Sequence, residues 1–242
     1  MTPVKARAVP LARAIRGLRA LRLGPAADAL RGGPVAEAIR RHRLIVVLRR
    51  IEPLDRLLAL VDELAGSGVR VFEITFDAPS AAEDVAAVRA HLGGRSDKPF
   101  LVGAGTLVGR DRLDAALRSG ADFGVAPVLD AWLVREAVAA GLPFVAGGLT
   151  PTEILAAWSA GATFVKLFPA SAVGPALVRE MRGPLPEIGL IPTGGIDAKN
   201  ASAFLDAGAA AVGIGSAFTK GDPATRRALV ASLSSAPMSS LP

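Results

Sequence analysis

The sequence predicts an α/β protein, a single (β/α)₈ (TIM) barrel preceded by an N-terminal helical extension. Three observations support this prediction. Eight short apolar runs rich in β-branched residues lie between residues 44 and 214. A helix-length amphipathic segment follows each run, a pattern typical of parallel strands joined by helical crossovers. Eight such units in a chain of 242 residues match the size of a compact closed barrel.

The elements follow one another regularly along the chain. A helical segment at 35–43 leads into the first run. The runs cover 44–48, 70–76, 100–103, 122–126, 143–146, 162–167, 189–192 and 210–214. Five runs follow a glycine that we expect to end the preceding helix: Gly68, Gly120, Gly141, Gly161 and Gly208. An open doubly wound sheet is the alternative, and the lack of a G-x-G-x-x-G motif after the first run argues against it.

Charge divides the chain into a basic extension, residues 1–34, and a barrel domain, residues 35–242. The formal net charge is +6, yet residues 1–43 alone hold ten basic and only two acidic side chains. The barrel is therefore close to neutral, and we expect no nucleic-acid partner.

The extension itself has an amphipathic pattern. Apolar residues at helical spacing alternate with arginines: Leu11, Ile15, Leu18 and Leu21 with Arg13, Arg16, Arg19 and Arg22. We favour a surface helix or a frayed tail over an organelle presequence or a membrane-surface helix. Gly24-Pro25 and Gly32-Gly33-Pro34 then have the composition of a linker.

Composition excludes several classes of protein. The chain has no cysteine and two histidines, so disulfides, thiolate catalysis and cysteine zinc sites are excluded, and a histidine-rich metal site is disfavoured. No apolar stretch has the length of a membrane span, and the start of the chain lacks the apolar core of a signal peptide. We expect a cytoplasmic protein with no membrane partner.

Lys166 is the most informative residue, because it interrupts an otherwise apolar strand at 162–167. A buried lysine is rare, and desolvation favours the neutral amine that can attack a ketone. A lysine that extends to the barrel mouth and pairs with a carboxylate is the structural alternative. From this strand alone, the two interpretations are equally good.

Glu73 favours the catalytic interpretation. Alternation along the second strand puts Val71, Glu73 and Thr75 on one face. Strands two and six lie opposite each other in an eight-stranded barrel, so Glu73 and Lys166 are expected to face each other. The carboxylate could be a structural partner of the lysine, or could transfer protons.

Glycine-rich segments follow the last two strands. Thr193-Gly-Gly-Ile and Gly213-Ile-Gly-Ser lie where barrels often bind a phosphate group. Tight turns alone would explain one such segment, but two at neighbouring strands favour a phosphate site. At the ends of the first and third strands, Arg49 and Thr106 suit a substrate carboxylate, while Arg50 is expected to face solvent.

Eight segments closely resemble the 2-keto-3-deoxy-6-phosphogluconate (KDPG) and 4-hydroxy-2-oxoglutarate (KHG) aldolase family. They cover about residues 35–225 in the same order and spacing as in the family. The segments are Val-Leu-Arg49, Glu73-Ile-Thr-Phe, Val-Gly-Ala-Gly-Thr106, Thr150-Pro-Thr-Glu153, Lys166-Leu-Phe-Pro169, Val173-Gly-Pro175, Pro192-Thr-Gly-Gly195 and Gly213-Ile-Gly-Ser216.

The resemblance implies a class I, metal-independent and cofactor-free aldolase that cleaves KDPG to pyruvate and glyceraldehyde 3-phosphate. It also implies a homotrimer and a place in the Entner–Doudoroff pathway. Lys166 would form the Schiff base, and Glu73 would be the general acid/base. The implied substrate-binding residues are Arg49, Thr106, Pro127, Phe168, Thr193, Gly194, Gly195 and Ser216.

Within that set, the resemblance assigns Arg49 and Thr106 to the substrate carboxylate. Gly194, Gly195 and Ser216 match phosphate contacts. Phe168 would form a wall of the pyruvyl pocket, and Thr193 matches a position associated with the gluconate-derived epimer.

This sequence departs from the family at three positions. Asp77 stands where some members have arginine, Ala126 replaces a common serine, and Ser171 resembles members that act on the galactonate epimer. Alternatives are therefore an aldolase for KHG or for 2-keto-3-deoxy-6-phosphogalactonate, and, outside enzymes, a silent phosphate-binding barrel.

Overall fold

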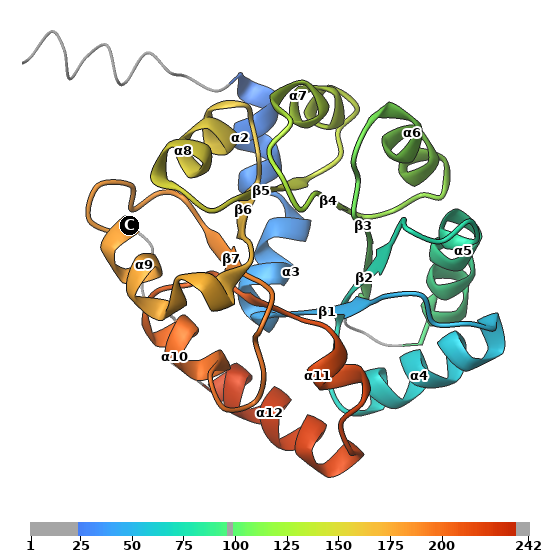
Figure 1. Cartoon of the computed structure of the whole chain (residues 1–242). Coiled ribbons are helices and arrows are strands. Elements are labelled where there is room, and N and C mark those ends of the chain that lie inside the picture. Colours follow the sequence, from blue (N-terminus) through green and yellow to red (C-terminus); the bar gives the residue numbers. More distant parts are fainter. Residues whose placement is uncertain (1–23, 96–98, 236–242) are drawn as a thin grey trace, which may run out of the picture.

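Eight parallel strands form a barrel in the computed structural model, which describes residues 24–95 and 99–235 (Figure 1). The strands are β1 Leu44–Leu48, β2 Val71–Thr75, β3 Leu101–Gly105, β4 Gly124–Val125, β5 Phe144–Gly148, β6 Phe164–Leu167, β7 Leu190–Pro192 and β8 Val212–Ile214. Each strand pairs with the next, β1 also pairs with β8, and a single parallel bridge between Thr193 and Gly213 joins β7 to β8. The predicted (β/α)₈ barrel is confirmed, and every strand overlaps a predicted run.

Helices surround the barrel and alternate with the strands (Figure 1). They are α4 Leu54–Gly66, α5 Ala81–Leu92, α6 Arg110–Arg118, α7 Ala131–Ala139, α8 Pro151–Ser159, α9 Gly174–Met181, α10 Ala201–Asp206, α11 Ser216–Thr219 and α12 Pro223–Ser235, with a short 3₁₀ turn at Ala170–Ala172. At the start of α8, Thr150 and Glu153 form a reciprocal capping box. The five glycines predicted to end helices all have positive φ, between 76° and 111°.

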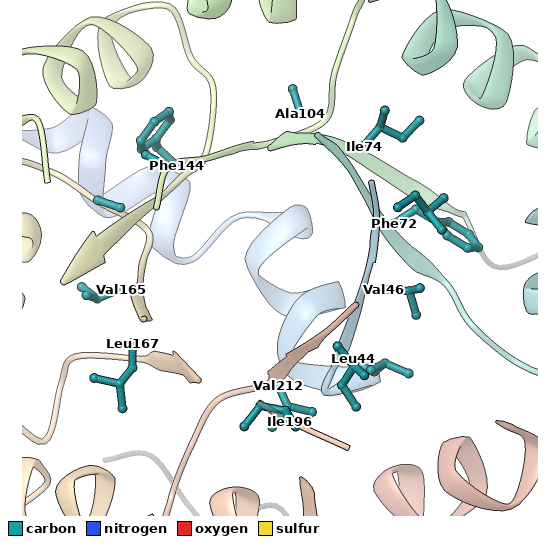
Figure 2. Packing of buried hydrophobic residues seen from close by; sticks show 14 of the residues in the cluster. Leu44, Val46, Phe72, Ile74, Ala104, Phe144, Val165, Leu167, Ile196 and Val212 are labelled. Carbon is teal, nitrogen blue, oxygen red and sulfur yellow. The ribbon is translucent and has the colours of Figure 1, made fainter. Parts of the chain in front are cut away.

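The outer core lies between the strands and these helices. Alternate strand residues point away from the barrel axis, among them Val46, Phe72, Ile74 and Val165 (Figure 2). All four side chains are buried against the helix layer. This outer core stabilises the barrel through apolar burial.

The inner core fills the amino-terminal end of the barrel. It contains inward-facing residues from most of the strands: Ile45, Val71, Leu101, Phe123, Val125, Val145, Phe164 and Ile191. Helix α3 (Pro34–His42) lies across this end in Figure 1 and adds Ala36 and Ile39 to the same cluster. The barrel is therefore closed by packing at its amino end.

The segment interpreted as a linker in fact contains a helix, α2 (Pro25–Arg31), which packs beside α7. Arg31 holds this helix in place, because its guanidinium donates to the carbonyls of Trp158 and Ala162 and lies 3.2 Å from the centre of the Trp158 ring. Burial lowers the pKa of Arg31 to about 10. The glycines and prolines suggested a linker, but Gly24 and Gly33 are N-caps with proline at the first helical turn.

The amphipathic arginine-rich stretch at 9–23 lies outside the described residues. Within the described part of the chain, no helix is long and apolar enough to cross a membrane.

Candidate active site

A cavity of about 500 Å³ opens at the carboxyl ends of the strands. Nine of the ten predicted site residues line it: Arg49, Thr106, Pro127, Lys166, Phe168, Thr193, Gly194, Gly195 and Ser216. The tenth, Glu73, lies directly beneath the cavity next to Lys166. The structure therefore brings all the predicted residues together at one end of the barrel.

Lys166 and Glu73 form a buried pair at the floor of the cavity. The Nζ of Lys166 lies 3.6 Å from Oε1 of Glu73, and the two side chains are 8% and 3% exposed. Among the described residues, Oε1 of Glu73 has no hydrogen-bond partner. The same oxygen faces Nζ of Lys166 at 3.6 Å, so the ion pair is what offsets its burial. A buried carboxylate next to an amine is suited to accept or deliver a proton.

Gly105 at the end of β3 makes room for Glu73. A Cβ atom built on Gly105 would lie 2.1 Å from Oε1 of Glu73, far inside contact distance. Any larger residue at position 105 would therefore displace the carboxylate. In the sequence, Gly105 lies just after the third predicted run, in Val-Gly-Ala-Gly-Thr106, and its approach to Glu73 could not be read from that position.

Arg49 reaches the cavity mouth from the end of β1 and pairs with Asp77. Its Nη1 donates to Oδ2 of Asp77 at 2.7 Å, while the hydroxyl of Thr75 donates to Oδ1 at 2.7 Å. Burial would raise the pKa of Asp77, but the Thr75 hydrogen bond and the charge of Arg49 outweigh it and hold that pKa below the ordinary value. Arg50 is exposed, as predicted, and also lies 3.4 Å from Asp77.

The two glycine segments meet at the ends of β7 and β8, next to Arg49, because β8 pairs with β1. Thr193 at the end of β7 bridges to Gly213 of β8, and Gly194, Gly195 and Ser216 line the space above them. The side chain of Asn200 ties this loop from behind, because it donates to the Gly195 carbonyl at 2.8 Å. Backbone N–H groups and a hydroxyl near one another are suited to an anionic group.

Thr106 and Phe168 complete the mouth of the cavity. Thr106 has φ 57°, an unusual conformation for a β-branched residue, and Arg112 donates to its carbonyl at 2.9 Å. The ring of Phe168 is 38% exposed and its centre lies 5.5 Å from Nζ of Lys166. An exposed aromatic ring beside the amine provides an apolar wall for a small ligand.

Sequence reasoning missed two residues that line the cavity, Val47 and Asp197, whereas Ile196 ends the glycine segment predicted at the phosphate site. Val47 could have been found, because alternation along the first strand puts it on the inner face with Ile45. Asp197 lies in a loop without periodicity, so no signal placed it there. In the described part of the chain, no group of three or more histidine, aspartate or glutamate side chains is arranged to hold a metal ion.

A larger hollow, about 690 Å³, lies between α5 and the start of β3 and includes Arg89, Phe100 and Ser119. It is at the amino ends of the strands, away from Lys166 and Glu73. Size alone therefore does not identify the reactive site, and we assign it to the smaller cavity, where the buried pair is.

Residues 35–228 match the family described as KDPG and KHG aldolase. The 2-dehydro-3-deoxy-6-phosphogalactonate aldolase of Escherichia coli K12 is 34% identical over 174 residues, which are 72% of this chain and 82% of that protein. The 2-dehydro-3-deoxy-phosphogluconate aldolase of Haemophilus influenzae is 35% identical over 166 residues, 68% of this chain and 76% of that protein.

A solved structure agrees in fold. The KDPG aldolase of Legionella pneumophila, crystallised with pyruvate captured at low pH as a covalent carbinolamine intermediate, superposes with a TM-score of 0.71 at 26% identity. The alignment covers 82% of this chain and 97% of the Legionella chain.

Proposed function

The chain belongs to the KDPG and KHG aldolase family, and we propose that its aldol reaction proceeds through a Schiff base between Lys166 and a 2-oxo acid. The observation that carries this proposal is the buried pair of Lys166 and Glu73 at the floor of the cavity. The Legionella relative, which captures pyruvate as a carbinolamine, supports the same chemistry.

The first half of the reaction removes water from the ketone. The neutral amine of Lys166 attacks C2 of the substrate, and the C2 oxygen leaves as water after taking one proton from the nitrogen and one from solvent, which the later hydrolysis returns. The resulting protonated imine withdraws electrons from the C3–C4 bond. Glu73, directly or through a water molecule, accepts the proton of the C4 hydroxyl. The C3–C4 bond then breaks, its electron pair passes to C3, and an aldehyde leaves.

The second half restores the enzyme. The enamine that remains on Lys166 takes a proton at C3, and Glu73 returns the proton that it accepted. Water then adds to the imine carbon and releases pyruvate and the free amine. The proton count on Glu73 is unchanged over the cycle, as required of a general acid/base.

Our proposed substrate is KDPG, which would release glyceraldehyde 3-phosphate. The carboxylate would bind at Arg49 and Thr106, and the phosphate at Gly194, Gly195 and Ser216, at the ends of β7 and β8 in the same cavity. Pro127 and Phe168 would enclose the pyruvyl part, and Thr193 would contact the sugar-derived hydroxyls. We also propose a homotrimer, which sedimentation of the purified protein would test.

The galactonate epimer is a second candidate substrate, favoured by the 34% identity to the Escherichia coli enzyme and by Ser171. A panel of both phosphorylated epimers and KHG would decide among them by kcat/KM. We expect a phosphorylated substrate to be preferred, and equal turnover without the phosphate would favour KHG instead.

The decisive test of the Schiff base is reduction with borohydride in the presence of pyruvate. We expect one covalent adduct per chain, located at Lys166 by mass spectrometry of peptides. Lys166→Ala should lose both the adduct and turnover, while Lys220→Ala, at an exposed lysine, should retain both. An adduct elsewhere, or none, would refute the proposal and favour a silent phosphate-binding barrel.

A further inference from the structure

Asp77 lies just beyond the end of β2 and does not line the cavity, yet three side chains from two strand ends converge on it. Its Oδ2 accepts from Nη1 of Arg49 at 2.7 Å, and Nε of Arg50 lies 3.4 Å away. Its Oδ1 accepts from the Thr75 hydroxyl at 2.7 Å. The Asp77 side chain is only 15% exposed, whereas those of Arg49 and Arg50 are 55% and 65% exposed. The carboxylate is thus the fixed member of the group.

This arrangement holds one edge of Arg49 and leaves the other edge for a ligand. Within the described residues, no hydrogen bond engages Nε or Nη2 of Arg49. A guanidinium binds a carboxylate best through two parallel N–H groups, which requires a fixed orientation of its plane. An arginine on an exposed strand end loses much rotational freedom on binding, unless another group has already oriented it.

Asp77 also partly neutralises the positive charge of Arg49 and Arg50. Arg49 and Arg50 together would present two positive charges, and the ionised Asp77 reduces the total to one. The low pKa of Asp77 keeps its carboxylate charged at neutral pH. This reduction weakens the attraction of the two arginines for anions in general.

We propose that Asp77 is a positioning residue for the carboxylate of the 2-oxo acid, because it orients Arg49 at the cavity mouth from behind. The inference rests on the proposed function. It assigns a role to the acidic residue at position 77 that acts through Arg49 and involves no contact with the substrate.

The experiment traps the pyruvate adduct with borohydride and measures the rate of adduct formation at increasing pyruvate concentrations. For Asp77→Ala we expect the half-saturating concentration to rise about tenfold, with the maximum trapping rate within about twofold of wild type, because only initial binding is weakened. Asp77→Asn keeps one oxygen acceptor in the same place, so the rise should be smaller, about threefold. This partial rescue separates positioning from a loss of folding.

Asp122→Ala is the matched control. Asp122 also pairs with an arginine, Arg89, at 2.9 Å, and its side chain is 19% exposed, but it lies at the amino end of β4. It also accepts a hydrogen bond from the Val102 N–H, so its loss should destabilise the fold at least as much. We expect its half-saturating concentration to match wild type.

Three results would overturn the inference. They are an unchanged or lower half-saturating concentration in Asp77→Ala, a fall in the maximum rate alone, or an equal rise in Asp122→Ala. Each leaves the Schiff base intact, since wild type still forms the adduct. Failure of wild type to form an adduct at Lys166 would instead refute the proposed function, and the inference with it.

Discussion

The two ends of the barrel interior are made from the same strands but have opposite contents. On β2, Val71 faces inward at the amino end, and Glu73 faces inward one pleat further on. On β6, Phe164 and Lys166 have the same relation. The amino end is filled with apolar side chains and sealed by α3, while the carboxyl end holds a charged pair and a cavity. The comparison teaches that a shift of two residues along a strand separates the apolar core of this barrel from its candidate active site.

The charged pair contributes little to stability. At 3.6 Å and an effective dielectric constant of about 20, the attraction between two unit charges is about 5 kcal/mol. Desolvation costs several kcal/mol for each ion, which offsets that attraction. The apolar amino end has no such penalty. We therefore expect changes at the carboxyl end to alter activity more than stability, and changes at the amino end to do the reverse.

Among the variants that compare the two ends of the barrel, Glu73→Gln should have the largest effect on kcat. A small effect would contradict the division between the two ends. Loss of the general acid/base should lower kcat by about 10²- to 10⁴-fold, while trapping of pyruvate survives at a reduced rate. Steady-state kinetics of aldol cleavage would measure this. Glu180→Gln, at an exposed site on α9, is the control and should leave kcat unchanged. A loss below threefold in Glu73→Gln would exclude Glu73 as the acid/base.

At the amino end, Ile39→Ala should lower the free energy of unfolding by about 2–5 kcal/mol, because Ile39 is 1% exposed in the inner core. Urea unfolding would measure the loss. The folded fraction should keep its kcat, since the cavity is at the other end. Leu117→Ala, at a side chain 36% exposed, should cost far less. A large fall in kcat of folded Ile39→Ala would show that the two ends are coupled.

Gly105→Ala tests the carboxyl end of the barrel with a minimal change, because it adds a single methyl group beside Glu73. The new Cβ would meet Oε1 of Glu73, so we expect kcat to fall by at least about tenfold, with a stability loss of about 1–3 kcal/mol from overpacking. Gly66→Ala is the control, since no atom lies within 4 Å of the added group. Both quantities come from kinetics and urea unfolding of the same samples. Wild-type activity in Gly105→Ala would mean that Glu73 can move without loss.

The smallest expected effect is the dependence of stability on Asp77 ionisation. The folded-state pKa of Asp77 is below its ordinary value of about 3.9, so the ionised group stabilises the fold above that pH. This stabilisation is lost as the pH falls through the lower, folded-state pKa. Asp77→Asn should therefore be less stable than wild type at pH 7, by up to about 1 kcal/mol, and this difference should shrink as the pH falls below about 3.9. An equal difference above and below that pH would contradict this assignment.

The sequence by itself determined the barrel, the strand order and the facing of Lys166 and Glu73. Period-two alternation and the opposition of strands two and six are consequences of backbone geometry, so they follow from residue spacing alone. The position of the glycine segments after β7 and β8 could also be predicted from the sequence, because all parallel strands of a barrel end on the same side. The linker interpretation was wrong because glycine and proline mark helix starts as well as linkers.

Only the tertiary structure decided three features: the space that Gly105 leaves for Glu73, the hold of Asp77 on Arg49, and the docking of α2 through Arg31. Each is a contact between side chains, or between a side chain and the backbone, of residues 28 to 131 positions apart. Such contacts depend on rotamers and on the distance between neighbouring strands or helices, which no period in the sequence encodes. The facing of Lys166 and Glu73 was therefore predictable from the sequence, whereas the side chains packed around them, and around Arg49, were visible only in the tertiary structure.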